Sequence, residues 1–196
     1  FAATDSGLLP TDAGQVYDFG LGDYNGDSMM DFIATGTIFY GYFEMGGGSW
    51  LYVANGHGFD LLGPSVGVRS DTLGSGIHDF NGDGLSDVCN IDWGWGIARL
   101  NLSTGYGFED LEAPLPAGIA PSYGAEIRIP LFADFTRDGR TDIMVTWADS
   151  WSAPFHWSLL VSLGDGFVAG PSGTGYGPGS LAPHDFNGDG WPDFLF

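Results

Sequence analysis

A nine-residue segment occurs four times in this 196-residue chain, each time with aspartate at positions 1, 5 and 9. We number these segments loops 1 to 4; they cover residues 23–31, 79–87, 134–142 and 185–193. Successive loops begin 56, 55 and 51 residues apart. A repeat of about 50 residues is typical of propeller blades, and it argues against folds that are built without internal repetition.

Two sets of short apolar segments keep the same period as the loops. The segments after the loops are DFIATG, DVCNID, DIMVTW and DFLF, and a second set, which ends in Gly-Phe, is WLYVANGHGF, ARLNLSTGYGF and LLVSLGDGF. Aromatic and β-branched residues bounded by Gly or Asp are typical of strands, and the Gly-containing turns are typical of hairpins. An apolar stripe at helical spacing over about 11 residues is missing.

These patterns predict an all-β fold of propeller-type blades, each of about four antiparallel strands. Residues 1–196 form a single repeat region that holds about three and a half units, since the copies begin and end out of phase with the chain. Such a number of blades does not close a propeller by itself. We therefore expect self-association, or contact with the rest of a longer chain.

Charge excludes several classes of partner. The chain has 25 acidic residues against 5 arginines and no lysine, which gives a formal net charge of -20. Such a protein repels phosphate backbones, so nucleic acid is not an expected partner. No apolar run approaches the roughly 20 residues that span a bilayer, so membrane insertion is not expected either. Of the acids, 21 are Asp, a residue that favours turns, caps and metal loops.

The loops have the composition of a calcium site. Side chains at positions 1, 3, 5 and 9, together with the carbonyl at position 7, offer the hard oxygen ligands that Ca²⁺ prefers, and glycine at position 6 permits a sharp turn. The alternative is that Asp-Gly and Asn-Gly merely build tight turns in which Asp caps backbone N–H groups. Four copies in phase favour calcium, with about four sites. An EF-hand is excluded because position 12 is never Glu.

Two loops depart from the common pattern. Ser28 replaces the position 6 glycine of loop 1, and Thr136 replaces the position 3 asparagine of loop 3. Loop 3 also contains Arg137 and Arg140, whose positive charges oppose a cation. Loop 3 is therefore predicted to bind calcium most weakly.

The Asp-Phe-Asn-Gly-Asp-Gly-x-x-Asp loops, the strand after each and the period of about 55 residues resemble FG-GAP/VCBS repeats, the calcium-binding blades of integrin alpha-chain propellers and of many secreted proteins. The resemblance implies an extracellular or cell-surface, non-catalytic module with the ion between the first two strands of a blade. The implied ligands are Asp23, Asn25, Asp27, the Met29 carbonyl and Asp31; Asp79, Asn81, Asp83, the Leu85 carbonyl and Asp87; Asp134, Thr136, Asp138, the Arg140 carbonyl and Asp142; Asp185, Asn187, Asp189, the Trp191 carbonyl and Asp193.

Tryptophans cluster after the second and third loops and are candidate glycan-binding residues: Trp93, Trp95, Trp147 and Trp151. Indole rings stack on the C–H faces of sugars, but they also fill the spaces between blades. Two functions stay open. The first is a carbohydrate-binding or adhesive module; the second is a structural or protein-interaction segment of a large secreted, toxin or fibre-forming protein. The expected partner is accordingly a glycan or an extracellular protein, and no catalytic constellation is evident.

Overall fold

The structure is a computed structural model that describes residues 13–40, 43–65, 78–117, 119, 126–127, 130–148, 154–175 and 183–193. These residues form strands, turns and isolated bridges. Across these ranges the chain has no helix, and so none that is long and apolar enough to cross a membrane. The all-β prediction is therefore confirmed.

Sheet 1 is a four-stranded antiparallel meander in the order β1-β2-β3-β4. Its strands are β1 (Ala13–Gly22), β2 (Asp31–Tyr40), β3 (Phe43–Ala54) and β4 (Phe59–Ser65). Loop 1 connects β1 to β2, and a short turn at 55–58 connects β3 to β4. The segments around loop 1 and before Gly58-Phe59 are thus strands where the sequence predicts them.

Sheets 2 and 3 repeat this plan, but a single bridge replaces the first strand in sheet 2, and two short strands, β8 (Glu126–Ile127) and β9 (Leu131–Ala133), replace it in sheet 3. Sheet 2 contains β5 (Val88–Asp92), β6 (Ile97–Ser103) and β7 (Phe108–Pro114). Sheet 3 contains β8, β9, β10 (Asp142–Ala148), β11 (Phe155–Ser162) and β12 (Phe167–Gly175). In sheet 2 a single antiparallel bridge between His78 and Asp87 stands where sheet 1 has its first strand, and the His184–Asp193 bridge frames loop 4 in the same way.

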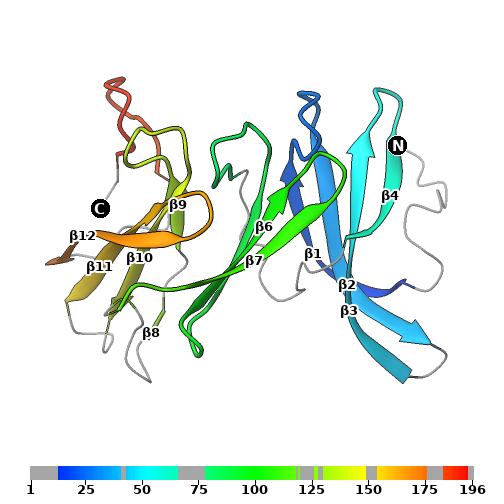
Figure 1. Ribbon diagram of the computed structural model, residues 1–196, viewed down its shortest axis with the longest axis horizontal. Helices are drawn as coiled ribbons and strands as arrows, with labels where there is room; N and C mark the ends of the chain where they lie inside the picture. Colours follow the sequence, from blue (N-terminus) through cyan, green and yellow to red (C-terminus); the bar gives the residue numbers. More distant parts are fainter. Residues whose placement is uncertain are drawn as a thin grey trace.

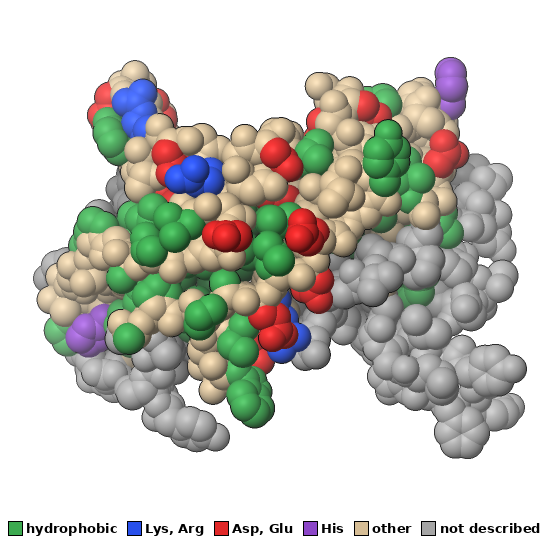
Figure 2. Space-filling model, in the orientation of Figure 1, with side chains coloured by type: hydrophobic (Ala, Val, Ile, Leu, Met, Phe, Trp, Pro, Cys, Tyr) green, Lys and Arg blue, Asp and Glu red, His purple; other side chains and the backbone are tan. Residues whose placement is uncertain are grey.

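The three sheets stand side by side, and all four loops lie along one edge of the molecule (Figure 1). This placement follows from the topology, because loops 1, 2 and 3 each join the first strand or bridge of their unit to the next strand, and a bridge also frames loop 4. The turn between β5 and β6, residues 93–96, lies at the opposite edge (Figure 1). Acidic side chains are spread over the described part of one face rather than collected in a single patch (Figure 2).

Apolar side chains fill the spaces between neighbouring sheets. One buried cluster joins sheets 1 and 2 and includes Tyr24, Ile33 and Val88. A larger cluster joins sheets 2 and 3 and includes Phe80, Leu100 and Ile143. Since these side chains come from strands far apart in the sequence, burial of their apolar surface holds the sheets together.

The aromatic residue at position 2 of a loop packs against the Gly-Phe phenylalanine of the next sheet. Tyr24 meets Phe108 with ring centroids 5.7 Å apart, and Phe80 meets Phe167 at 6.0 Å. Both position 2 side chains are almost fully buried. Phe186, at position 2 of loop 4, is 53% exposed, and no sheet follows it among the described residues.

Candidate metal loops and aromatic pocket

The position 1 aspartate organises each loop by accepting backbone hydrogen bonds. In loop 2, Asp79 Oδ1 accepts from the N–H groups of Gly82 and Asp83 at 2.6 and 3.1 Å, and Oδ2 accepts from Gly84 at 2.8 Å. Loops 1 and 4 have the same three bonds. The chain can turn back so tightly because Gly82 and Gly84 have φ near 80°.

Positions 3 and 5 are tied together across the loop. In loop 2, Asn81 Nδ2 donates to Asp83 Oδ2 at 2.9 Å, and Asn81 Oδ1 accepts from the Asp83 N–H at 3.0 Å. Asp83 Oδ1 accepts from the position 7 N–H, that of Leu85, at 2.8 Å. The corresponding bonds occur in loops 1 and 4.

The position 9 carboxylate joins the loop to the sheet beneath it. Asp87 Oδ2 accepts from the Phe80 N–H and Oδ1 accepts from the Ser103 N–H, both at 2.8 Å. Asp31 and Asp142 likewise bind a loop N–H and the last residue of the third strand, Ala54 or Ser162. All three carboxylates are at most 1% exposed, so they are part of the core.

Burial makes these position 9 carboxylates difficult to ionise. Desolvation raises the pKa of Asp87 to about 7, although its bonds to the Ser103 and Phe80 N–H groups oppose the shift. Desolvation also raises the pKa of Asp31 and of Asp142. The arginine ion pairs of the described residues are Arg99–Glu112 and Arg140–Asp138, so these carboxylates have no guanidinium partner there. A buried carboxylate without a cation is expected to stay protonated or to recruit one.

Loop 3 differs from the others at the positions singled out in the sequence. Thr136 donates from both its N–H and its hydroxyl to Asp142 Oδ2, so position 3 is used to hold position 9. The Arg140 side chain donates to Asp138 Oδ2 at 2.5 Å, and its Nε donates to the Ser162 carbonyl at 3.0 Å. The Arg140 guanidinium thus binds the position 5 carboxylate of loop 3, whereas in loop 2 the position 5 carboxylate is bonded to Asn81.

The donor chemistry of the loops fits calcium, but the ligands are not gathered into a finished site. Within the ranges that the structure describes, no three Asp, Glu, His or Cys side chains form a group that could hold a metal ion. Each carboxylate has about four lone-pair positions, and the hydrogen bonds described above use three of those of Asp79 and two of those of Asp83. Oxygen acceptors therefore remain in each loop for a hard cation.

Hydroxyl groups connect neighbouring loops across the sheet boundaries. At position 8 of loop 2, the Ser86 hydroxyl accepts from the Asp23 N–H at 2.9 Å, and the Ser86 N–H donates to the Asp23 carbonyl at 2.8 Å. At position 8 of loop 3, Thr141 makes the same two bonds with Asp79, at 3.1 and 2.7 Å. We call this reciprocal pair the hydroxyl clamp.

A second serine reinforces the clamp at each boundary. Ser103 Oγ donates to the Tyr24 carbonyl at 2.5 Å, and Ser162 Oγ donates to the Phe80 carbonyl at 2.7 Å. Both serines are buried, and each is the last residue of the third strand of its unit, β6 or β11. Sequence reasoning missed these four hydroxyl residues, although the recurrence of Ser or Thr at position 8 in loops 2 and 3 is a visible signal.

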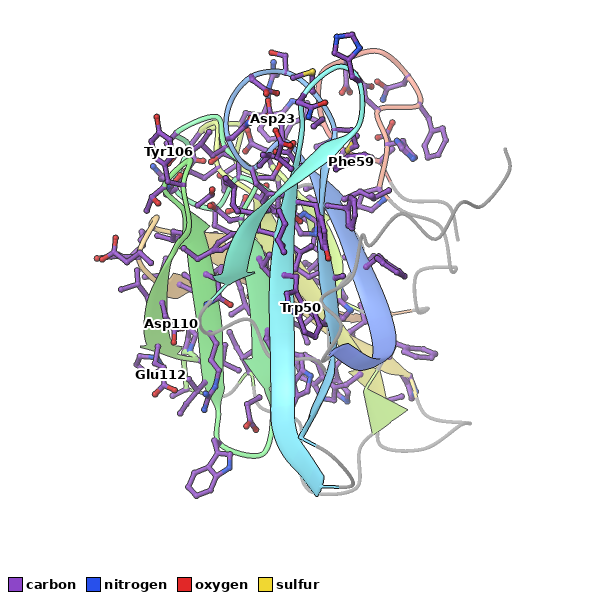
Figure 3. All side chains as sticks on the ribbon, turned by 90° about the vertical axis from the view of Figure 1, so that its right-hand side faces the viewer. Asp23, Trp50, Phe59, Tyr106, Asp110 and Glu112 are labelled. Carbon is purple, nitrogen blue, oxygen red and sulfur yellow. The ribbon has the colours of Figure 1, made fainter. Side chains whose placement is uncertain are left out.

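Of the four tryptophans proposed from the sequence, the three that the structure describes do not share one site. Trp95 is 79% exposed on the turn between β5 and β6, at the edge opposite the loops. Trp93 and Trp147 are partly buried and pack against the cluster that joins sheets 2 and 3. Trp151 lies outside the described residues. Trp50, on β3, is 4% exposed and belongs to the core of sheet 1, well below the loop that carries Asp23 (Figure 3).

Trp147 also lines a pocket of about 320 Å³. Its indole stacks on the His156 ring at 5.5 Å with 20° between the planes. Ser172 and Thr174 of β12 supply hydroxyl groups to the lining, and Ile119 closes it from the segment that follows sheet 2. The pocket therefore combines a flat aromatic surface with hydrogen-bonding groups, and sequence reasoning had not identified its β12 wall.

Comparison with known families explains this repeating architecture. A family model described as "FG-GAP-like repeat" matches residues 79–145 and again residues 134–196, which together make up more than half of the chain. The chain belongs to the FG-GAP-like repeat family. The two FG-GAP-like matches contain loops 2, 3 and 4, with β5 after loop 2 and β10 after loop 3, and sheet 1 with loop 1 has the same design.

A curated relative points in the same direction. Mouse (Mus musculus) integrin alpha-E is 36% identical over 81 residues, a match that covers 35% of this FG-GAP-like chain and 7% of the relative. The chain therefore spans a small fraction of the length of that protein. The match supports an integrin-alpha-like FG-GAP repeat with β-propeller-type blades.

Proposed function

We propose that this chain is a non-catalytic extracellular recognition module whose blades are stabilised by calcium and whose ligand is a glycan. The observation that carries the glycan proposal is the pocket that is lined by the stacked rings of Trp147 and His156 together with Ser172 and Thr174. An aromatic platform beside hydroxyl donors and acceptors matches a pyranose, which has an apolar C–H face and a polar rim. The integrin alpha-E match supports an extracellular or cell-surface location.

The calcium part of the proposal is supported by the loops. Each loop would hold one ion through the oxygens at positions 1, 3, 5, 7 and 9, and bound Ca²⁺ would supply the positive charge that buried Asp31, Asp87 and Asp142 lack. Calcium would thereby favour the ionised form of these carboxylates and fix the loops at one edge of the blades. The ion has a structural role here.

The experiment for the glycan proposal is a glycan array, followed by titration of the best ligand. We expect Ser172→Tyr to abolish binding, because the new ring fills the pocket from an exposed position on β12 without removing a core side chain. Trp147→Ala is expected to abolish it as well, whereas Trp95→Ala serves as the matched tryptophan control, because Trp95 does not line the pocket. Wild-type binding that survives Ser172→Tyr would contradict the assignment.

A protein-interaction role is the second candidate, and exposed apolar residues on sheet 1 favour it. Phe19, Leu21, Phe59, Leu61 and Leu62 are between 43% and 55% exposed. Phe59 is the Gly-Phe residue of sheet 1, and its equivalents Phe108 and Phe167 cover a neighbouring loop. Native mass spectrometry distinguishes the roles: a defined assembly that Phe59→Ser disrupts, with no hit on the glycan array, would support the scaffold function.

A further inference from the structure

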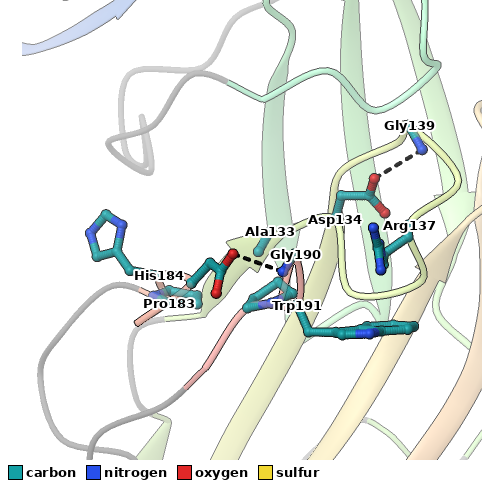
Figure 4. Close-up of a pocket in the computed structure, with 10 residues that line it drawn as sticks. Ala133, Asp134, Arg137, Gly139, Pro183, His184, Gly190 and Trp191 are labelled. Carbon is teal, nitrogen blue, oxygen red and sulfur yellow. Dashed lines mark hydrogen bonds between the residues drawn. The ribbon is translucent and has the colours of Figure 1, made fainter. Parts of the chain in front are cut away.

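Loops 3 and 4 meet without the hydroxyl clamp that joins the other described loops. Position 8 of loop 4 is Pro192, which has neither a hydroxyl group nor a backbone N–H. Instead, the guanidinium carbon of Arg137 lies 5.1 Å from the ring centroid of Trp191, so a cation–π contact connects the two loops. A cavity of about 560 Å³ lies between them (Figure 4).

Arg137 occupies a backbone position that three of the four loops give to glycine. Its φ is 59°, and the equivalent Gly26, Gly82 and Gly188 have φ of 79°, 79° and 77°. A side chain in this left-handed conformation strains the backbone, and such strain is concentrated at functional sites. The arginine is therefore not explained by the turn, which glycine would form with less strain.

The charge of Arg137 is also unmatched. Among the described residues, Arg99 pairs with Glu112 and Arg140 pairs with Asp138, but Arg137 has no ion pair. In a chain with 25 acids and 5 arginines, an arginine held on an indole beside a cavity is conspicuous. A planar guanidinium fixed in this way presents its remaining N–H groups for a bidentate bond to a carboxylate.

The carboxylates of the two aspartates in the cavity wall accept hydrogen bonds from the backbone of their own loops. Asp134 accepts from the N–H groups of Asp138 and Gly139, and Asp185 accepts from those of Gly188, Asp189 and Gly190. Two of these bonds are visible in Figure 4. The hydrogen bond from Gly190 is the largest cause that lowers the pKa of Asp185. The carboxylates are thus partly neutralised by backbone dipoles.

We propose that the cavity between loops 3 and 4 binds the carboxylate of an acidic saccharide, with Arg137 as the anchor. Trp191, which is 46% exposed, supplies the flat surface for the sugar ring, and Pro183 and Pro192 extend the apolar wall. This inference rests on the proposed glycan-binding function and adds a second subsite that selects for a negative charge. It also assigns a role to Arg137, which stands where loops 1, 2 and 4 have glycine.

A saccharide fits the cavity better than an acidic peptide does. Peptides that bind by strand addition need a free sheet edge, whereas the cavity is lined mostly by loop residues, and the two ladder residues in its wall, Ala133 and His184, already pair with Asp142 and Asp193. The prolines have no N–H group, and the Trp191 N–H already donates to Asp189, so the indole platform offers no main-chain donor to a peptide backbone. It does match the C–H face of a pyranose.

The experiment uses the full chain in a buffer of fixed calcium concentration, titrated with a hyaluronan tetrasaccharide and with its carboxyl-reduced neutral form. We expect the acidic sugar to bind and Arg137→Gly to weaken it by roughly tenfold or more, since a charge-assisted bidentate contact is lost. Arg137→Lys should restore only part of the affinity, because lysine keeps the charge without the planar fork. Arg99→Ala is the control for overall charge.

Arg137→Gly is a demanding test because glycine is the residue of the other loops at this position, so the variant should fold with an unchanged or higher melting temperature. The proposal is overturned if the acidic sugar does not bind, if the neutral sugar binds equally well, if Arg137→Gly binds as well as wild type, or if an acidic peptide binds and the sugar does not. Ser172→Tyr separates this subsite from the proposed glycan pocket: it should leave binding of the acidic sugar intact, and loss of that binding in this variant would assign the sugar to the other pocket.

Discussion

At position 6 of loop 1, Ser28 has a φ of 65°, whereas the glycines at this position in the other loops have φ of 85–87°. A non-glycine residue in the left-handed region costs free energy that glycine avoids, although glycine also makes the unfolded chain more flexible. We expect Ser28→Gly to stabilise the protein by about 0.5–1 kcal/mol. Urea denaturation measures the effect. Ser28→Ala, which keeps a Cβ, should give no gain, and an equal gain from alanine would contradict the strain argument.

Arg140 is the residue that limits the proposed calcium site of loop 3. Its guanidinium binds Asp138, whereas Leu85 at the same position of loop 2 leaves Asp83 free of positive charge. We expect loop 3 to fill last in a calcium titration, and Arg140→Leu to raise its affinity roughly three- to fivefold, the worth of a partly exposed ion pair. Loop-resolved NMR titration measures the order, with Arg99→Leu as a control for net charge. Filling of loop 3 before loop 2 would contradict the prediction.

At the scale of elements, the strands were predictable because their signals are local. The segments that follow loops 1, 2 and 3 and those that precede Gly-Phe are strands, since aromatic and β-branched residues next to glycine turns decide the backbone conformation within a few residues. The fourth such segment, residues 193–196, lies almost entirely outside the described residues. The pairing between sheets was harder to predict, because it depends on residues about 60 to 80 positions apart.

The large separation in sequence between interacting residues also limits how much of the site can be predicted. The loop positions that carry acids could be read from the sequence, but the burial of Asp87 depends on sheet 2 folding beneath it. Of the tryptophans, the sequence could not separate exposed Trp95 from partly buried Trp147, because both follow a loop at a similar distance. Only the packing of neighbouring sheets determines which indole stays exposed and which one packs against the core and lines a pocket.

The hydroxyl clamp gives a prediction for the contact between sheets 1 and 2. Ser86 is 2% exposed, and its hydroxyl is the acceptor for the Asp23 N–H. Ser86→Ala leaves that N–H without this partner, so we expect a loss of about 1–2 kcal/mol in the free energy of unfolding. Denaturant unfolding tests it against Thr104→Ala, whose exposed hydroxyl bonds only within its own turn and should cost less than about 0.5 kcal/mol. Equal losses of unfolding free energy for the two variants would contradict a stabilising role for the hydroxyl clamp.

The close approach of sheets 1 and 2 also requires a glycine at position 22. A Cβ on Gly22 would lie 2.6 Å from Ser86 Cβ and 2.8 Å from its hydroxyl oxygen, so any larger residue there would push loop 2 away from loop 1. Gly22 therefore serves the contact between sheets rather than a turn, since it is the last residue of β1. The clamp and this glycine are two parts of one interface.

At the scale of the whole molecule, the proposed calcium ions account for much of the acidic charge, because 12 of the 25 acids occupy positions 1, 5 and 9 of the loops. Ligands that bind only the folded state stabilise it by mass action, by about 2.7 kcal/mol for each site at a 100-fold excess over Kd. We therefore expect EDTA to lower the melting temperature clearly. Excess calcium should restore it and magnesium should not, because Mg²⁺ prefers to keep its waters. An unchanged melting temperature in EDTA would refute the calcium role.

The hydroxyl groups at the sheet boundaries also give the repeats a direction in evolution. Sheets 2 and 3 each bind the preceding unit through a position 8 hydroxyl and a serine at the end of the third strand, whereas sheet 1 has Met30 and Ala54 at these places. A gene duplication that copied sheet 2 or 3 would produce a unit able to join its predecessor at once. A copy of sheet 1 inserted behind another sheet would lack both bonds, so expansion of this array is expected to proceed through its later units.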